Sequence, residues 1–231
     1  MYVIKRKTII MFAAIILGFI GLVTTIAVYT AMPSSAPLGL TVVIDAGHGG
    51  RDGGVQGRTT GIHEAEINLA IARNLRSFLE GKGYRVIMTR STPDGLYGLA
   101  TDNRKLQDMA ARRRIIQDAE PDLVISIHQN SFPSPTVRGP QVFFAPRSEE
   151  GERFATIMQN VLNANLGADR IPRPGDFFIL QCNEFPALLI ETGFLSNPEE
   201  ERLLISAAHQ EKVAYSLFVG IHTILFPTTL A

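Results

Sequence analysis

Residues 41–50 of the chain, TVVIDAGHGG, decide the fold. The first five of them, Thr41–Asp45, form a short apolar run rich in β-branched side chains, which predicts a buried strand. Glycines then crowd residues 47–57, so the strand must end in a loop. From Glu64 the apolar residues follow helical spacing. A buried strand, a loop and a helix are the repeating unit of an α/β domain.

The same alternation continues along the chain. Further strands are expected at residues 84–89, 123–127, 141–145, 177–180 and 187–190. Helices are expected from residue 64 to the glycines at 81 and 83, at 103–118 and 149–166, and as one or two closing helices within 198–226. Apolar strands that alternate with helices predict an α/β domain. Its central sheet should be mixed but mostly parallel, with helices on both faces.

The N-terminus has a different composition. The basic residues Lys5–Lys7 precede the run Ile9–Val28, which contains no charged residue. A helix of that length spans about 30 Å, the thickness of the hydrocarbon layer of a bilayer. A cleavable signal peptide has a shorter apolar core, and the best cleavage site, Thr25–Ala27, is poor. We therefore expect residues 1–31 to be a transmembrane anchor with the rest of the chain outside the cytoplasm. Secretion after cleavage is the alternative.

Composition limits the remaining possibilities. Residues 32–40 are rich in proline and serine and are expected to be a short linker to a single domain at residues 41–226. The 22 basic and 22 acidic side chains cancel, so we expect no binding of nucleic acid. The single cysteine, Cys182, has no partner for an internal disulfide, and we expect a buried structural thiol.

Side chains that bind metals or carry protons stand at the ends of expected strands. His48, His128 and Glu191 each lie at or just beyond the end of one strand, where functional groups of α/β sheets gather. Glu64 begins the first helix and can point to the same edge. Two histidines and one carboxylate leave a tetrahedral zinc ion with one open position, as in hydrolytic sites. A further carboxylate must then move the proton, and Glu191 is the candidate.

Four segments resemble, in order, the motifs of the zinc amidase family known as amidase type 3. They are Asp45–Asp52 (DAGHGGRD), Glu64–Leu69 (EAEINL), Ser126–Asn130 (SIHQN) and Glu191–Asn197 (ETGFLSN). The resemblance implies a zinc amidase catalytic domain at residues 41–226. It implies that His48, Glu64 and His128 bind Zn²⁺, and that Glu191 is the catalytic carboxylate.

Three further residues stand near these motifs. Asn130 is a candidate for contact with the metal site or with the substrate. Arg112 belongs to a run of three arginines that is most simply a solvated helix face. It also aligns with an arginine common in the family, which implies a supporting or substrate-binding role. His63 is an alternative ligand, but neighbouring helical residues point about 100° apart, so His63 and Glu64 do not easily face one ion.

The resemblance implies hydrolysis of the amide bond between N-acetylmuramic acid and L-alanine in peptidoglycan. A zinc peptidase that cuts within the stem peptide would use the same chemistry. A non-catalytic peptidoglycan-binding protein would be expected to lack a ligand or the base. A lone catalytic domain behind an N-terminal anchor resembles the spore-cortex members of the family, and the sequence gives no indication of an accessory protein partner.

The segment between Ala145 and Phe177 bears on access to the site. It contains one amphipathic helix, expected at residues 149–166, and the following ten residues are too few for a second packed helix. We therefore expect an open groove with the three metal ligands at its floor and no helix of this segment covering them.

Overall fold

The fold is known from a computed structural model that describes residues 39–99 and 102–227. The expected anchor and most of the expected linker lie outside these described residues. Within them, no helix is both long and apolar enough to cross a membrane.

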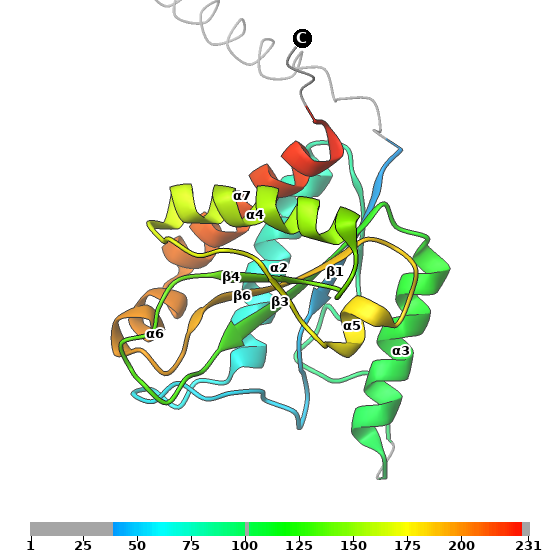
Figure 1. The fold of residues 1–231 in the computed structure, drawn as a ribbon. Helices are drawn as coiled ribbons and strands as arrows, with labels where there is room; N and C mark the ends of the chain where they lie inside the picture. The colour runs from blue at the N-terminus through cyan, green and yellow to red at the C-terminus, as the bar shows by residue number, and fades with distance from the viewer. Residues whose placement is uncertain (1–38, 100–101, 228–231) are drawn as a thin grey trace, which may run out of the picture. The chain divides into compact units, whose positions relative to one another are not determined.

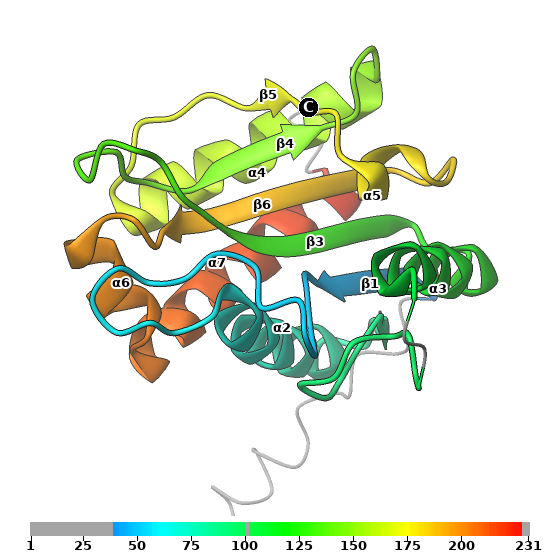
Figure 2. The same ribbon diagram turned by 90° about the horizontal axis from the view of Figure 1, so that it is seen from below.

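The described residues build one mixed six-stranded sheet in the order β2-β1-β3-β6-β4-β5, and Figure 2 shows the larger strands side by side. The strands are β1 (Thr41–Ala46), β2 (Arg85–Met88), β3 (Leu123–Asn130), β4 (Gln141–Phe144), β5 (Arg173–Pro174) and β6 (Ala187–Phe194). β1 pairs in parallel with β2 and β3, and β3 with β6, whereas β4 pairs with β6 antiparallel. The predicted mixed, mostly parallel sheet is confirmed.

Helices cover both faces of this sheet, as predicted (Figure 1). One face carries α2 (Glu64–Gly81), α4 (Glu149–Leu166) and α7 (Ala207–Leu225). The other face carries α3 (Arg104–Ala119) and α5 (Phe178–Gln181), and α6 (Pro198–Leu204) follows β6. The expected closing region is thus divided into two helices.

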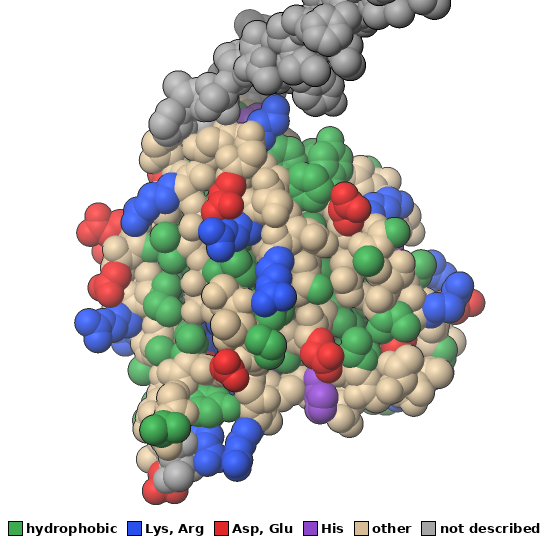
Figure 3. Space-filling model, turned by 180° about the vertical axis from the view of Figure 1, so that it is seen from behind, with side chains coloured by type: hydrophobic (Ala, Val, Ile, Leu, Met, Phe, Trp, Pro, Cys, Tyr) green, Lys and Arg blue, Asp and Glu red, His purple; other side chains and the backbone are tan. Residues whose placement is uncertain are grey.

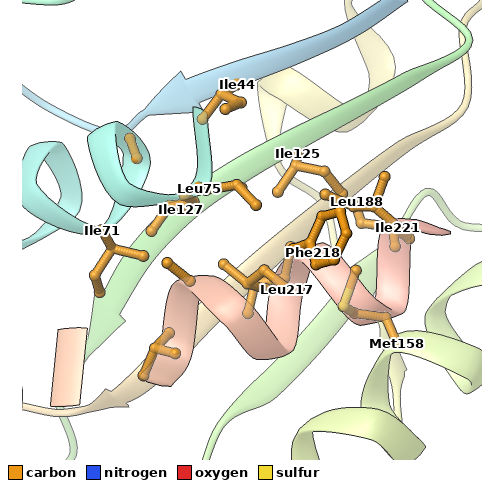
Figure 4. Close-up of a cluster of buried hydrophobic side chains, with 14 of the residues drawn as sticks. Ile44, Ile71, Leu75, Ile125, Ile127, Met158, Leu188, Leu217, Phe218 and Ile221 are labelled. Atoms are coloured by element: carbon orange, nitrogen blue, oxygen red, sulfur yellow. The ribbon is translucent and has the colours of Figure 1, made fainter. Parts of the chain in front are cut away.

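Each face of the sheet has its own apolar core. Val42 and Ile44 of β1 belong to the larger core, whereas Val43 between them belongs to the smaller one. Successive side chains of a strand point to opposite faces, which explains this division. Figure 4 shows the larger core, where strand side chains pack against α2, α4 and α7. Burial on both faces accounts for the continuous apolar runs in the central strands.

The prediction of a strand at residues 177–180 is wrong, because this segment begins the short helix α5. The neighbours Ile179 and Leu180 both belong to the smaller core on one face of the sheet, whereas successive side chains of a strand point to opposite faces. α5 packs against β6 and α3. A short apolar run cannot be assigned to strand or helix from periodicity alone.

The surface carries charges of both signs. On the face shown in Figure 3, basic and acidic side chains are interspersed rather than gathered. This distribution agrees with the equal numbers of basic and acidic residues, 22 of each, in the chain.

Candidate metal centre

Three elements bring His48, Glu64 and His128 together. β1 and β3 are parallel neighbours, so the residues that follow β1 and those at the end of β3 lie at the same edge of the sheet, where α2 also begins. One potential ligand atom from each residue lies within 4.8 Å of the others. The Oε1 atom of Glu64 is 2.8 Å from Nδ1 of His128 and 3.4 Å from Nε2 of His48. These three side chains could hold one metal ion.

The orientation of the His48 ring is set by Asp52. Nδ1 of His48 lies 2.8 Å from Oδ1 of Asp52, whose other oxygen accepts a hydrogen bond of 2.9 Å from Nζ of Lys105. Burial alone would raise the pKa of Asp52, but hydrogen bonds from Lys105 and His48 lower it to about 2. An ionised Asp52 can only accept, so Nδ1 of His48 carries the proton and Nε2 is left to bind a metal.

Both oxygens of Glu64 are held in place. Its Oε2 accepts a hydrogen bond of 2.9 Å from the backbone N–H of Val55, and its Oε1 accepts one of 3.0 Å from the backbone N–H of Gln129. The Nδ2 group of Asn68 lies 3.3 Å from the same Oε1. Burial alone would raise the pKa of Glu64, but its contacts with the rings of His128 and His48 lower it strongly. Glu64 is therefore ionised, as a metal ligand must be.

Two glycines leave the space that the ligands occupy. A Cβ atom at Gly47 would meet the ring of His128. A Cβ atom at Gly54 would meet both the Glu64 carboxylate and the His48 ring, and the φ of Gly54, +69°, also favours glycine. The glycine-rich loop therefore fits tightly around the candidate ligands.

Glu191 and the three candidate ligands, His48, Glu64 and His128, line one cavity, which has a volume of about 480 Å³. Glu191 lies on β6, opposite His128 in the register with β3. Its Oε2 is buried without a hydrogen-bond partner among the described residues. Burial raises the pKa of Glu191 to about 7. An unpartnered carboxylate beside two histidines and a second carboxylate fits a site that holds a cation and a reacting water.

Asn130 and Arg112, the two other candidate residues, lie in different environments at the cavity. Asn130 lines the cavity, and its Oδ1 accepts a hydrogen bond of 2.8 Å from the backbone N–H of Ser131. Arg112 also borders the cavity but is only 1% exposed. The prediction of a solvated face is therefore wrong for Arg112, although it holds for its exposed neighbours Arg113 and Arg114. Arg112 can be buried because two carboxylates balance its charge.

His63, Cys182 and Arg90 lie outside the set of candidate ligands. His63 caps α2, and its ring faces Gln56 rather than the three candidate ligands. Cys182 is buried and burial raises its pKa, as expected for a structural thiol. Arg90, which the sequence did not single out, is buried behind the loop that carries His48. An arginine next to a strand normally suggests a surface position, so no local signal pointed to it.

The one long helix within residues 145–177, α4, packs away from the candidate site. It lies on the face of the sheet opposite to α3 and α5, against α7 and β4. The residues that follow β5 reach the cavity, where Asp176 and Phe177 form one wall together with the start of α5. Lys105 and Met109 of α3 also line the cavity. The two histidine side chains are each 19% exposed at its floor.

The site brings together two histidines and a carboxylate, with a second carboxylate beside them. This set of side chains is typical of a hydrolytic metalloenzyme rather than of a structural metal site. The family model for N-acetylmuramoyl-L-alanine amidase matches residues 42–223. The chain therefore belongs to the N-acetylmuramoyl-L-alanine amidase family.

Individual relatives agree with this assignment. The germination-specific N-acetylmuramoyl-L-alanine amidase of Bacillus subtilis is 38% identical over 197 residues, which are 82% of this chain and 81% of the relative. The CwlD amidase of Clostridioides difficile, solved in complex with the GerS lipoprotein, aligns with a TM-score of 0.78 at 33% identity, over 80% of this chain and 98% of that one. The catalytic domain of the amidase CwlV from Bacillus (Paenibacillus) polymyxa aligns with a TM-score of 0.72 at 30% identity, with the same two coverages.

Proposed function

We propose that this enzyme hydrolyses the amide bond between N-acetylmuramic acid and L-alanine in peptidoglycan with zinc as its cofactor. His48, Glu64 and His128 hold the metal ion in this proposal, and Glu191 carries the proton. Membership of the amidase family supports the reaction. The observation that carries the site assignment is the convergence of the three ligand atoms within 4.8 Å, next to a carboxylate oxygen without a partner.

The proposed mechanism divides the work between fixed and free groups. When bound, zinc supplies a Lewis acid that polarises a carbonyl group and makes water more acidic. Asp52 keeps Nε2 of His48 directed at the ion, and the backbone N–H groups around Glu64 keep its carboxylate in place. Glu191 accepts a proton from the attacking water and returns it to the nitrogen of L-alanine as that group leaves.

Mass spectrometry of digested peptidoglycan tests the reaction. We expect stem peptides that begin with a free L-alanine amino group and glycan strands that keep intact lactyl groups. A chelator should abolish these products, and added zinc should restore them. Cleavage between two amino acids of the stem would instead support a zinc peptidase, and the lack of any product would support a non-catalytic binding protein.

We further propose a spore-cortex role, membrane anchoring through residues 9–28 and a protein partner. The name of the Bacillus subtilis relative supports the first, and the apolar run supports the second. The related Clostridioides difficile amidase was solved with a lipoprotein, which supports a partner for this chain. Deletion of the gene should leave vegetative growth intact and impair spore germination, if the cortex is the substrate.

A further inference from the structure

Two buried arginines hold the backbone that carries His48. Arg112 and Arg90 are 1% and 3% exposed. Nη2 of Arg112 donates a hydrogen bond of 2.6 Å to the carbonyl oxygen of His48, and Nη1 donates one of 2.9 Å to that of Ala46. Nε of Arg90 donates one of 2.8 Å to Ala46, and Nη2 donates one of 2.9 Å to the carbonyl oxygen of Gly47. The carbonyl groups of three successive residues thus accept hydrogen bonds from guanidinium groups.

The conformation of His48 explains why such support matters. Its φ is 61°, in the left-handed region that a residue with a Cβ atom rarely adopts. The following residues, Gly49 and Gly50, also have positive φ values and have no side chains that could restrict the loop. A conformation of this kind persists only where the surroundings impose it. At the carbonyl groups of residues 46–48 these surroundings are the guanidinium groups and the side-chain amide of Asn68. Backbone hydrogen bonds from Gly49 to Asp52 and from Gly50 to Pro93 hold the residues that follow.

The arginines are themselves fixed. Nε of Arg112 donates a hydrogen bond of 2.6 Å to Asp108, and Nη1 donates one of 2.6 Å to Asp45. Asp45 also accepts hydrogen bonds from the hydroxyl groups of Ser126 and Thr89. A buried guanidinium requires such partners, because an unpaired charge in the interior is costly. Each of the three guanidinium nitrogens of Arg112 therefore has a defined acceptor. Only a planar guanidinium group can reach these acceptors together.

We propose that Arg112 and Arg90 are positioning residues that set the affinity of the metal centre for zinc by holding His48 in its left-handed conformation. This inference rests on the proposed metal centre. The hydrogen bonds of both arginines toward this loop end on backbone carbonyl groups and not on the side chain of a candidate ligand, so the arginines act through the backbone. If the two arginines were purely structural, their replacement would lower the stability of the fold without changing the zinc affinity of the folded protein.

A pair of adjacent lysine substitutions tests this proposal in the full-length protein. Arg112→Lys keeps the charge but removes the fork, whereas Arg113→Lys makes the same change at an exposed position of the same helix. Competition with a chromophoric chelator measures the dissociation constant for zinc, and circular dichroism establishes that each variant is folded. We expect about 10–100-fold weaker zinc binding for Arg112→Lys, as for other residues that orient ligands, and no change for Arg113→Lys.

The structure of the folded Arg112→Lys protein identifies the route of the effect. His48 should leave its left-handed conformation in that protein, so that its φ is no longer near 61°. Unchanged zinc affinity, or weaker zinc binding with the φ of His48 retained, would overturn the inference. If Arg112→Lys does not fold, Arg90→Lys gives the same test. Full zinc retention by a His128→Ala protein would instead refute the metal centre itself.

Discussion

Replacing Glu191 with glutamine should stabilise the metal-free protein at high pH, although it removes the proposed base. Oε2 of Glu191 is buried without a partner among the described residues, and burial raises the pKa of this carboxyl from 4.5 to about 7. Between these two values the folded protein binds more protons at this site than the unfolded chain does. The stability of the wild-type protein therefore falls as the pH rises through that interval.

The magnitude follows from the difference in pKa. A difference of one in pKa corresponds to about 1.4 kcal/mol, so ionised Glu191 lowers the free energy of unfolding by about 3 kcal/mol above pH 7. Glutamine has nearly the same shape and cannot ionise. Glu191→Gln should therefore raise the free energy of unfolding of the chelated protein by about 3 kcal/mol at pH 8, and by less than about 1 kcal/mol at pH 5.

Urea unfolding in the presence of a chelator measures this effect at the two pH values. Glu184→Gln is the matched control, because Glu184 is exposed and its substitution should change stability by less than about 0.5 kcal/mol. Equal stability of the wild-type and Glu191→Gln proteins at pH 8 would refute the reasoning. It would mean that the pKa of Glu191 is not raised in the folded protein, as it would be if a group there were paired with the ionised carboxylate.

Further predictions concern zinc, turnover and location. Glu191→Gln should keep its zinc but lose about 10²–10⁴-fold in the rate of muropeptide release, and a near-normal rate would exclude Glu191 as the base. His128→Ala should lose zinc in elemental analysis, since one of three ligands is gone. Gly54→Ala should also lose zinc, whereas Gly61→Ala, with a similar φ of +72° but open space around it, should retain zinc. The full-length protein should fractionate with membranes, and a soluble exported protein beginning near Ala27 would show a cleaved signal instead.

The positions of the candidate ligands in the sequence made them candidates, and the resemblance to the amidase motifs implied their roles. His48 lies in the loop after β1 and His128 lies on β3, and the parallel pairing of these two strands brings both residues to one edge. Glu64 follows from the start of a helix that the apolar spacing already indicated. Strand ends and helix starts are local features of the sequence, so they could make these residues candidates before the structure was known.

Contacts between distant segments were harder to predict. Arg90 and Arg112 lie in segments of ordinary polar composition, and their burial depends on acceptors that tertiary folding brings to them. A helical face with three arginines has the same local pattern whether one of them is buried or all are solvated. The helix α5 was missed for a related reason, since its packing against β6 and α3 brings together segments that are distant in the chain. Only the tertiary arrangement contains this information.

The tertiary arrangement also distinguishes Glu64 from Glu191, two carboxylates that cannot be told apart by residue type. Glu64 is buried, yet its contacts with His128 and His48 lower its pKa, and backbone N–H groups hold its carboxylate in place, so it stays ionised and fixed. Glu191 borders the same cavity, yet lacks such donors among the described residues, and burial raises its pKa to about 7. A group that binds a cation needs a permanent charge, whereas a group that carries a proton needs a pKa near the working pH. The opposite environments of the two carboxylates therefore favour Glu64 as the ligand and Glu191 as the base.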